Sequence, residues 1–251
     1  MSLYGERFVP TEKTSGFYKE HIQRYRFCKP YIEGKTILDL GCGTGYGSAI
    51  MLTLGAREVI GTDIDPDAIK FAKKNFKKRK LSFYIADAIS LPFPNNSFDV
   101  VVSFEVIEHM KDYQQYIQEV LRVLKKKGYC IFSTPNRKQY RAGTSPYHFK
   151  EFTAQDLREL YKPFGKLELF GQFFTNEAFV EYEKEYFKHY TTLTGKNKTF
   201  KKALHLVPPE IKAWIYKRIR GTSKHIPPSE VIIKKGNLDK AITLIGVFIK
   251  K

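Results

Sequence analysis

Between residues 35 and 174 the chain alternates short apolar runs of strand length with segments in which apolar residues recur at helical spacing. One helical segment ends near Leu54, and the next begins at Pro66, with Asp65 as its capping residue. Two further helical segments cover 112–124 and 153–161. This alternation predicts an α/β fold with a doubly wound, parallel sheet whose ligands bind at the carboxyl ends of the strands. The predicted strands lie at 37–40, 59–62, 81–86, 98–104, 129–133 and 167–171.

The regions outside this alternation predict two further parts of the chain. Residues 1–34 are expected to be helical, because helical spacing covers most of their second half. Residues 175–237 are basic and aromatic, contain two Pro-Pro pairs, and predict a helical insertion. A last strand is expected at 241–249. The sheet domain should therefore comprise residues 35–174 and 238–251.

The composition excludes several classes of protein. With 42% hydrophobic and 15% aromatic residues, the chain can bury a sizeable core and is neither disordered nor fibrous. No apolar run reaches the ~20 residues that a membrane span needs. The first residues show no signal-peptide pattern, and three cysteines without Cys-x-x-Cys spacing favour neither a disulfide framework nor a structural zinc site. A cytoplasmic location is expected.

The net charge of +17 is unevenly distributed. Residues 184–224 hold eleven Lys and Arg against two Glu, about half of the surplus in a sixth of the chain. Their mixture of apolar and basic residues fits a helical cap on the sheet domain, an anionic membrane surface or RNA. The aliphatic content favours the membrane surface over RNA, and would place the protein at the inner surface of the membrane.

A glycine-rich loop, Asp39-Leu40-Gly41-Cys42-Gly43-Thr44-Gly45, follows the first predicted strand and opens a helix. Glycines let the backbone approach a ligand closely, and an acid beside them suits a cationic or zwitterionic ligand better than a pyrophosphate. Asp63 ends the second strand, where it could accept hydrogen bonds from ribose hydroxyls. Asp87 follows the third strand, where it could meet an adenine amino group.

This loop, together with segments 61–65, 86–88 and 98–101, resembles the successive motifs of class I S-adenosylmethionine-dependent methyltransferases. The resemblance implies a Rossmann-like, seven-stranded sheet with a reversed last strand and S-adenosyl-L-methionine as the cofactor. It also implies that the three loop glycines line the methionine part, Asp63 holds the ribose, Ile64 flanks the adenine and Asp87 binds its amino group. The complete expected set is Asp39, Gly41, Cys42, Gly43, Gly45, Asp63, Ile64, Asp87, Ala88 and Phe104.

A second group of polar residues is expected to face the methyl acceptor. Glu105, Glu108 and His109 follow the fourth strand at a spacing that places them on one side of a helical turn. His148 follows the fifth strand and could enter the same cleft. Two carboxylates and two imidazoles suit Mg²⁺ or another divalent metal. Alternatively, His109 or His148 acts as a base without a metal, or the residues have only structural roles.

Two further resemblances concern the acceptor. The Glu-x-x-Glu-His sequence and a later His are similar to ubiquinone-biosynthesis O-methyltransferases and small-RNA 2′-O-methyltransferases, which implies Glu105, Glu108, His109 and His148 as metal ligands. Segments 6–10, 21–25, 133–136 and 148–152, with Gly171-Gln172, look more like prokaryotic methyltransferases associated with polysaccharide and cell-envelope glycan synthesis.

We therefore expect O-methylation of a glycan or of a lipid-linked small molecule, with His109, His148 and Glu105 as catalytic residues. RNA 2′-O-methylation is the alternative activity. A non-catalytic binding protein with the same fold is the alternative to an enzyme.

Overall fold

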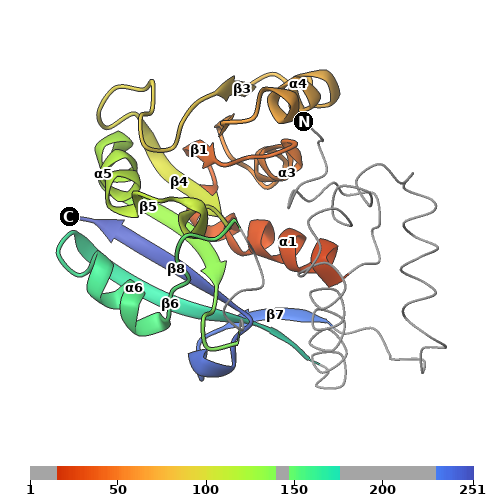
Figure 1. The fold of residues 1–251 in the computed structure, drawn as a ribbon. Coiled ribbons are helices and arrows are strands. Elements are labelled where there is room, and N and C mark those ends of the chain that lie inside the picture. The colour runs from red at the N-terminus through yellow and green to blue at the C-terminus, as the bar shows by residue number, and fades with distance from the viewer. Residues whose placement is uncertain (1–15, 140–146, 176–229) are drawn as a thin grey trace, which may run out of the picture. The chain divides into compact units, whose positions relative to one another are not determined.

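The computed structural model describes residues 16–139, 147–175 and 230–251 (Figure 1). The basic segment 184–224 and the first half of the predicted N-terminal part therefore lie outside the described residues. The chain divides into two compact units, one of which is Leu3–Phe173 with Val231–Lys251. This unit holds the elements discussed below. Among the described residues, no helix combines the length and apolar character required to span a membrane.

The elements follow one another in the predicted alternation. In chain order they are α1 (Gly16–Phe27), α2 (Lys29–Ile32), β1 (Thr36–Leu40), α3 (Tyr46–Thr53), β2 (Glu58–Asp63), α4 (Pro66–Asn75), β3 (Leu81–Ile85), β4 (Phe98–Phe104), the 3-10 turn η1 (Ile107–His109), α5 (Tyr113–Val123), β5 (Leu124–Pro135), α6 (Ala154–Tyr161), β6 (Gly165–Phe174), β7 (Val231–Lys234), the 3-10 turn η2 (Leu238–Lys240) and β8 (Thr243–Lys250).

The strands form one mixed sheet in the order β3-β2-β1-β4-β5-β8-β6-β7. Neighbouring strands from β3 to β5 are parallel, whereas β8 runs antiparallel to both β5 and β6. The α/β fold and the reversed last strand are thus confirmed. The sheet has eight strands rather than seven, because the four residues Val231–Lys234 add a strand at its edge. Assigning them to a helical insertion was wrong: their β-branched Val-Ile-Ile run favours a strand.

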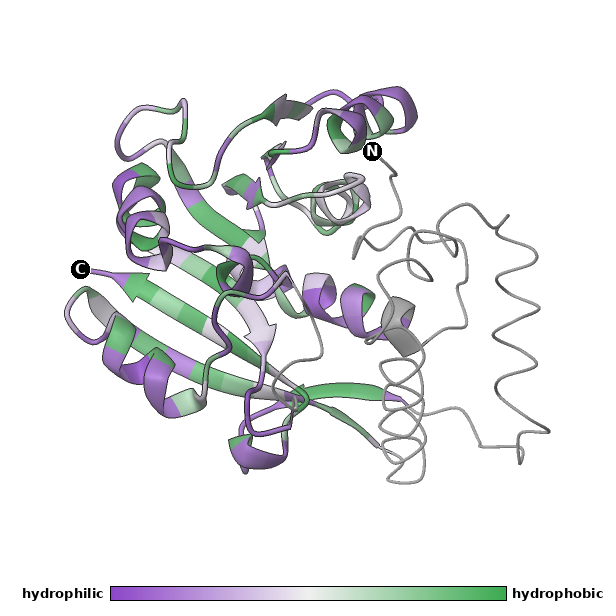
Figure 2. Cartoon of the chain, viewed as in Figure 1, coloured by the Kyte–Doolittle hydropathy of each residue, from purple (hydrophilic) through white to green (hydrophobic). Residues whose placement is uncertain are grey.

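Both faces of the sheet are covered by helices (Figure 1). Side chains of β1 alternate between the faces, so Leu38 and Leu40 join a cluster with α5 and α6, whereas Ile37 joins a cluster with α1, α2 and α3. Figure 2 shows the result, apolar strands in the middle and polar outer faces on the helices. A sheet buried on both faces explains why its strands read as nearly continuous apolar runs.

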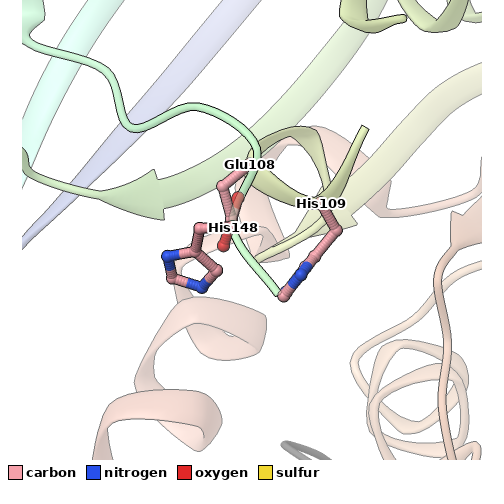
Figure 3. A group of neighbouring side chains, drawn as sticks. All are labelled: Glu108, His109 and His148. Carbon is pink, nitrogen blue, oxygen red and sulfur yellow. The ribbon is translucent and has the colours of Figure 1, made fainter. Parts of the chain in front are cut away.

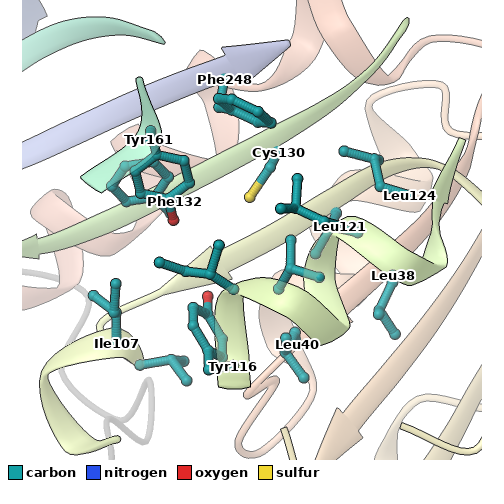
Figure 4. Packing of buried hydrophobic residues seen from close by; sticks show 14 of the residues in the cluster. Leu38, Leu40, Ile107, Tyr116, Leu121, Leu124, Cys130, Phe132, Tyr161 and Phe248 are labelled. Carbon is teal, nitrogen blue, oxygen red and sulfur yellow. The ribbon is translucent and has the colours of Figure 1, made fainter. Parts of the chain in front are cut away.

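The cluster under α5 and α6 combines aliphatic side chains with several aromatic rings (Figure 4). Tyr161 of α6 stacks on Phe132 of β5, with ring centroids 4.7 Å apart and planes 9° apart. Tyr116 of α5 and Phe248 of β8 are buried in the same cluster. The cluster fixes α5 and α6 on one face and leaves the carboxyl ends of the parallel strands to carry polar side chains.

Candidate active site

The glycine loop leaves β1 in a conformation that favours glycine. Gly41, Gly43 and Gly45 have φ angles of 78°, 52° and 82°, which L-residues with a side chain rarely adopt. The N–H groups of Gly41 and Cys42 both donate to the carbonyl of Thr62 at 2.8 Å. These two hydrogen bonds hold the loop against the end of β2, so the loop and Asp63 lie together.

The three glycines differ in what surrounds them. A Cβ at Gly41 would collide with the side chain of Val106, and one at Gly45 would lie 2.7 Å from Ala72 and from Phe83. A Cβ at Gly43 would meet nothing within 4 Å. The first and third glycines are therefore required by packing, whereas Gly43 presents bare backbone to open space where a ligand can approach. The loop fits the cofactor that the sequence implies.

The acids at the strand ends lie beside this loop or follow the next strand. Asp63 accepts hydrogen bonds from the N–H of Gly43 and the N–H of Asp65, both at 2.9 Å. Asp87 is exposed and accepts from the N–H of Ile89 at 3.1 Å. Ile64, which directly follows Asp63, is 62% exposed, although isoleucine is usually buried. An exposed apolar side chain that directly follows a strand-end carboxylate suits a ligand with a flat ring and hydroxyl groups.

The remaining predicted cofactor residues are mostly buried. Cys42 and Phe104 are buried and Ala88 is half-buried. The Phe104 ring, at the end of β4, packs edge-on against Tyr25 of α1 with centroids 5.1 Å apart. Any contribution of these three residues to cofactor binding would therefore be apolar.

Asp39 faces the interior rather than the open side of the loop. Its carboxylate is 1% exposed and accepts a short hydrogen bond from the hydroxyl of Ser48 in α3. Burial raises the pKa of Asp39 to about 7, although the Ser48 hydroxyl lowers it. The side chain therefore joins β1 to α3.

Glu108, His109 and His148 form a second polar group, in which the side chains converge (Figure 3). One potential ligand atom from each lies within 4.8 Å of the others. The two imidazole rings are 4.9 Å apart between centroids. The segment after β5 is held against the 3-10 turn because the N–H of Phe149 donates to the carbonyl of Glu108 at 2.8 Å. The structure thus brings together three of the four predicted ligands.

Each histidine of this group has an outer partner at Nδ1. His109 Nδ1 lies 3.2 Å from the carbonyl of Tyr147, and His148 Nδ1 lies 3.3 Å from the Glu151 carboxylate. An imidazole that donates from Nδ1 carries its lone pair on Nε2. Carbonyl and carboxylate partners of this kind typically orient histidines that bind metals. The same arrangement also orients a histidine that acts as a base.

Glu108 is the buried member of the group. Its side chain is fully buried, and Oε2 accepts a hydrogen bond from the Thr134 hydroxyl at 3.0 Å. Oε1 has no hydrogen-bond partner among the described residues. Burial, and secondly the neighbouring Glu105 charge, hold the pKa of Glu108 well above its ordinary value. A cation beside Oε1 would satisfy this oxygen and stabilise the ionised carboxylate.

Glu105, the fourth predicted ligand, is turned to a different partner. Its Oε1 accepts from the Ser133 hydroxyl at 2.7 Å and lies 3.1 Å from Nη1 of Arg24. Although burial lowers the pKa of the Arg24 guanidinium, the carboxylates of Glu105 and Glu20 raise it above its ordinary value. Glu105 therefore belongs to an ion-pair network with α1 and not to the group of Glu108, His109 and His148.

Several residues that shape the site have no role predicted from the sequence. Thr134 and Glu151 support Glu108 and His148, and Arg24 pairs with Glu105. His21, one turn before Arg24, is 2.7 Å from the Tyr46 hydroxyl through Nδ1, and burial lowers its pKa to about 3. The available signal was helical spacing, because residues 20, 21, 24 and 25 share one side of α1.

Comparison with known proteins supports the methyltransferase resemblance that the sequence motifs indicate. Residues 38–132 match the family model described as a methyltransferase domain. Over 165 residues, 64% of the chain, it is 33% identical to the probable S-adenosylmethionine-dependent methyltransferase Rv3030 of Mycobacterium tuberculosis. Residues 38–132 therefore form a methyltransferase domain. The predicted family is thus confirmed for this domain, although the matched part of the chain spans only 59% of the length of that relative.

Other relatives of this methyltransferase domain have more specific names. The chain is 30% identical over 128 residues to the fatty-acid O-methyltransferase of Mycolicibacterium smegmatis, covering 50% of the chain and 47% of the relative. It is 31% identical over the same length and coverage to the phthiotriol/phenolphthiotriol dimycocerosates methyltransferase of Mycobacterium leprae. Among solved structures, a methyltransferase from Archaeoglobus fulgidus superposes with a TM-score of 0.57 at 20% identity, over 92% of this chain and 94% of that one. At that identity the structural likeness shows the fold alone.

Proposed function

We propose that the chain is an S-adenosylmethionine-dependent methyltransferase that methylates a hydroxyl group of a lipid-linked or glycan acceptor. The observation that carries this proposal is the open backbone at Gly43, whose N–H is hydrogen-bonded to Asp63. His109 and His148 follow other strands of the same sheet, at the edge where the parallel strands end. One group of residues suits the cofactor and the other suits proton removal from an acceptor.

The cofactor supplies an electrophilic methyl group on a sulfonium sulfur. The chain's own residues would bind and orient it: Gly43 offers close backbone approach, Asp63 accepts from the ribose hydroxyls, and Asp87 from the adenine amino group. Ile64 supports the adenine with its exposed apolar side chain. Since methyl transfer is an in-line displacement, holding donor and acceptor in position accounts for much of the acceleration.

A hydroxyl acceptor must lose its proton as the new bond forms. His148, oriented by the Glu151 carboxylate, or His109, oriented by the Tyr147 carbonyl, is suited to take that proton at Nε2. A divalent cation is a further part of the proposal. In the form of the site with a bound cation, Glu108, His109 and His148 would hold it, so the histidines would not act as bases, and the cation would lower the pKa of the acceptor hydroxyl instead. Glu105 would act through its charge, since Arg24 holds its carboxylate.

Two observations support a lipid-linked acceptor. The Tyr147 and Phe149 side chains, which flank His148 in sequence, are 59% and 66% exposed, so apolar surface borders the proposed base. Two relatives are named for methylation of a fatty acid and of phthiotriol dimycocerosates. The names belong to those proteins, and they favour an acceptor with an alkyl chain over a free sugar.

The test is to incubate the full chain with methyl-labelled cofactor and separate lipid, glycan and RNA fractions of cells. Label in a lipid or glycan fraction is expected, whereas label confined to RNA would replace the proposed acceptor class with the alternative activity. Asp63→Ala should abolish cofactor binding in calorimetry, because it removes the acceptor for the ribose hydroxyls. Asp67→Ala is the matched control, since Asp67 is an exposed carboxylate in the first turn of α4. Unchanged affinity of the Asp63 variant would refute the cofactor site.

A further inference from the structure

Arg24 is a buried cation at the carboxyl edge of the sheet. It is 2% exposed, and its guanidinium contacts side chains from three strands. Nε donates to Gln172 of β6 at 2.8 Å, and Nη1 lies 3.5 Å from Ser133 of β5. Nη2 lies 3.3 Å from Glu20 and 3.5 Å from Thr243 of β8. A buried guanidinium is stable only when its donors are satisfied in this way.

Glu105 is the only acidic partner of Arg24 outside its own helix among the described residues. Its Oε1 receives both the Ser133 hydroxyl and the Arg24 Nη1 donor. Its backbone is also fixed, because its N–H donates to the Ser133 carbonyl at 3.1 Å and its φ is 56°, the left-handed region that a non-glycine residue rarely adopts. A residue in this region next to an ion pair is held there by its surroundings.

We propose that Arg24 withholds Glu105 from the group of Glu108, His109 and His148, so that this group offers a cation three ligands and α1 is tied to the acceptor side of the site. The inference rests on the cation of the proposed function. If Glu105 moved to ligate that cation, Arg24 would keep Glu20 as its only carboxylate partner, inside the protein. Glu108 has the opposite need, because its Oε1 lacks a partner among the described residues.

Arg24 is thus a positioning residue that acts through Glu105. It also connects α1 to the site. Gln172, which accepts from Arg24, donates to the Glu20 carbonyl of the same helix at 2.9 Å. Removing the guanidinium should free Glu105 to approach the cation, and the affinity for the cation should then depend on Glu105.

The experiment titrates the full chain with Mn²⁺ and detects free Mn²⁺ by electron paramagnetic resonance. Glu108→Gln should weaken binding by about tenfold or more, whereas Glu105→Gln should change it by less than about threefold. In an Arg24→Met background, Glu105→Gln should weaken binding clearly. Arg24→Gln serves as a second background should the methionine variant fold poorly, because it removes the positive charge but keeps a polar side chain that can hydrogen-bond to Ser133 and Gln172. Equal losses for Glu105→Gln and Glu108→Gln in the wild-type background would overturn the proposal.

A second measurement does not depend on the cation. Urea unfolding of the Arg24→Gln and Glu105→Gln variants, singly and combined, forms a double-mutant cycle, since each single variant removes the ion pair. The midpoint of the double variant should fall by less than the two single losses together; additive losses would also overturn the proposal. A wild-type chain that binds the methyl donor but no Mn²⁺ would refute the cation and this inference with it, while the cofactor site stands. A chain that binds Mn²⁺ but no methyl donor would refute the methyltransferase instead.

Discussion

The carboxyl group of Asp39 is ionised at a cost, because it lies under the glycine loop with 1% exposure. Its pKa is about 7 in the folded protein, against an ordinary value of 3.8. Between these values the native state binds a proton that the unfolded state does not bind. The free energy of unfolding should therefore fall as pH rises from about 4 to about 7, by as much as about 4 kcal/mol.

Asp39→Asn should remove this dependence, because an amide does not titrate and can still accept from the Ser48 hydroxyl. In urea unfolding of the protein without ligand, the variant should gain stability relative to wild type between pH 5 and pH 8. Asp99→Asn is the control. Burial raises the pKa of Asp99, but hydrogen bonds from Lys125 and the Thr36 N–H outweigh it and keep the pKa low, so its contribution should be constant over this window. A constant difference between Asp39→Asn and wild type would contradict the prediction.

Individual site residues differ in how far the sequence could predict them. Asp63 and the loop glycines could be predicted because they are adjacent to a strand end, where local pattern and position coincide. Arg24 could not, since its partners Glu105, Ser133, Gln172 and Thr243 lie up to 219 residues away along the chain. For the same reason helical spacing alone placed Glu105 with Glu108 and His109, whereas the left-handed backbone at Glu105 and the Arg24 ion pair separate it from them.

At the scale of elements, the loop between β1 and α3 contains a natural matched pair of substitutions. Both Gly43→Ala and Gly45→Ala impose a left-handed φ on a residue with a side chain, a cost of roughly 1 kcal/mol. Only the second also pushes a Cβ to 2.7 Å from Ala72 and Phe83. Gly45→Ala should therefore lower the melting temperature of the protein without ligand by more than Gly43→Ala does.

Among the variants that remain folded, Gly43→Ala should weaken cofactor binding more than Gly45→Ala does. Gly43→Ala places its methyl group in the open space beside the loop, so calorimetry should show weakened binding of S-adenosylmethionine although the protein remains folded. Wild-type affinity in Gly43→Ala would mean that the cofactor does not approach this backbone.

The elements themselves were predictable to different degrees. Strands buried on both faces give continuous apolar runs, which is why β4 was predicted at its observed bounds, Phe98–Phe104. The start of β5 was missed because Leu124–Pro135 begins directly after α5 with three lysines, which carry no strand signal. β7 was missed because four residues inside a basic segment are too few to show a period.

At the scale of the whole molecule, the net charge of +17 is unevenly distributed along the chain. The described site is lined with carboxylates and imidazoles, and residues 184–224 hold about half of the positive surplus. Thr175 and Glu230 border residues 176–229 in sequence, and the Thr175 N–H donates to the Glu230 carbonyl at 2.9 Å. The Glu230 N–H donates to the Thr175 hydroxyl at 3.1 Å. A short turn could therefore join these two residues.

Replacing residues 176–229 with a four-residue Gly/Asn/Ser turn should leave the sheet domain folded, because the clusters that the described residues form on both faces of the sheet already bury its strands. Cofactor affinity should persist. Binding to phosphatidylglycerol vesicles at ~150 mM salt should be lost, since the lysines and arginines of 184–224 are the proposed contacts with anionic lipid. Phosphatidylcholine vesicles are the control for apolar adsorption. A truncated chain that still sediments with the anionic vesicles would transfer the membrane contact to the sheet domain. A full chain that does not bind the vesicles but binds RNA under the same conditions would favour RNA as the acceptor.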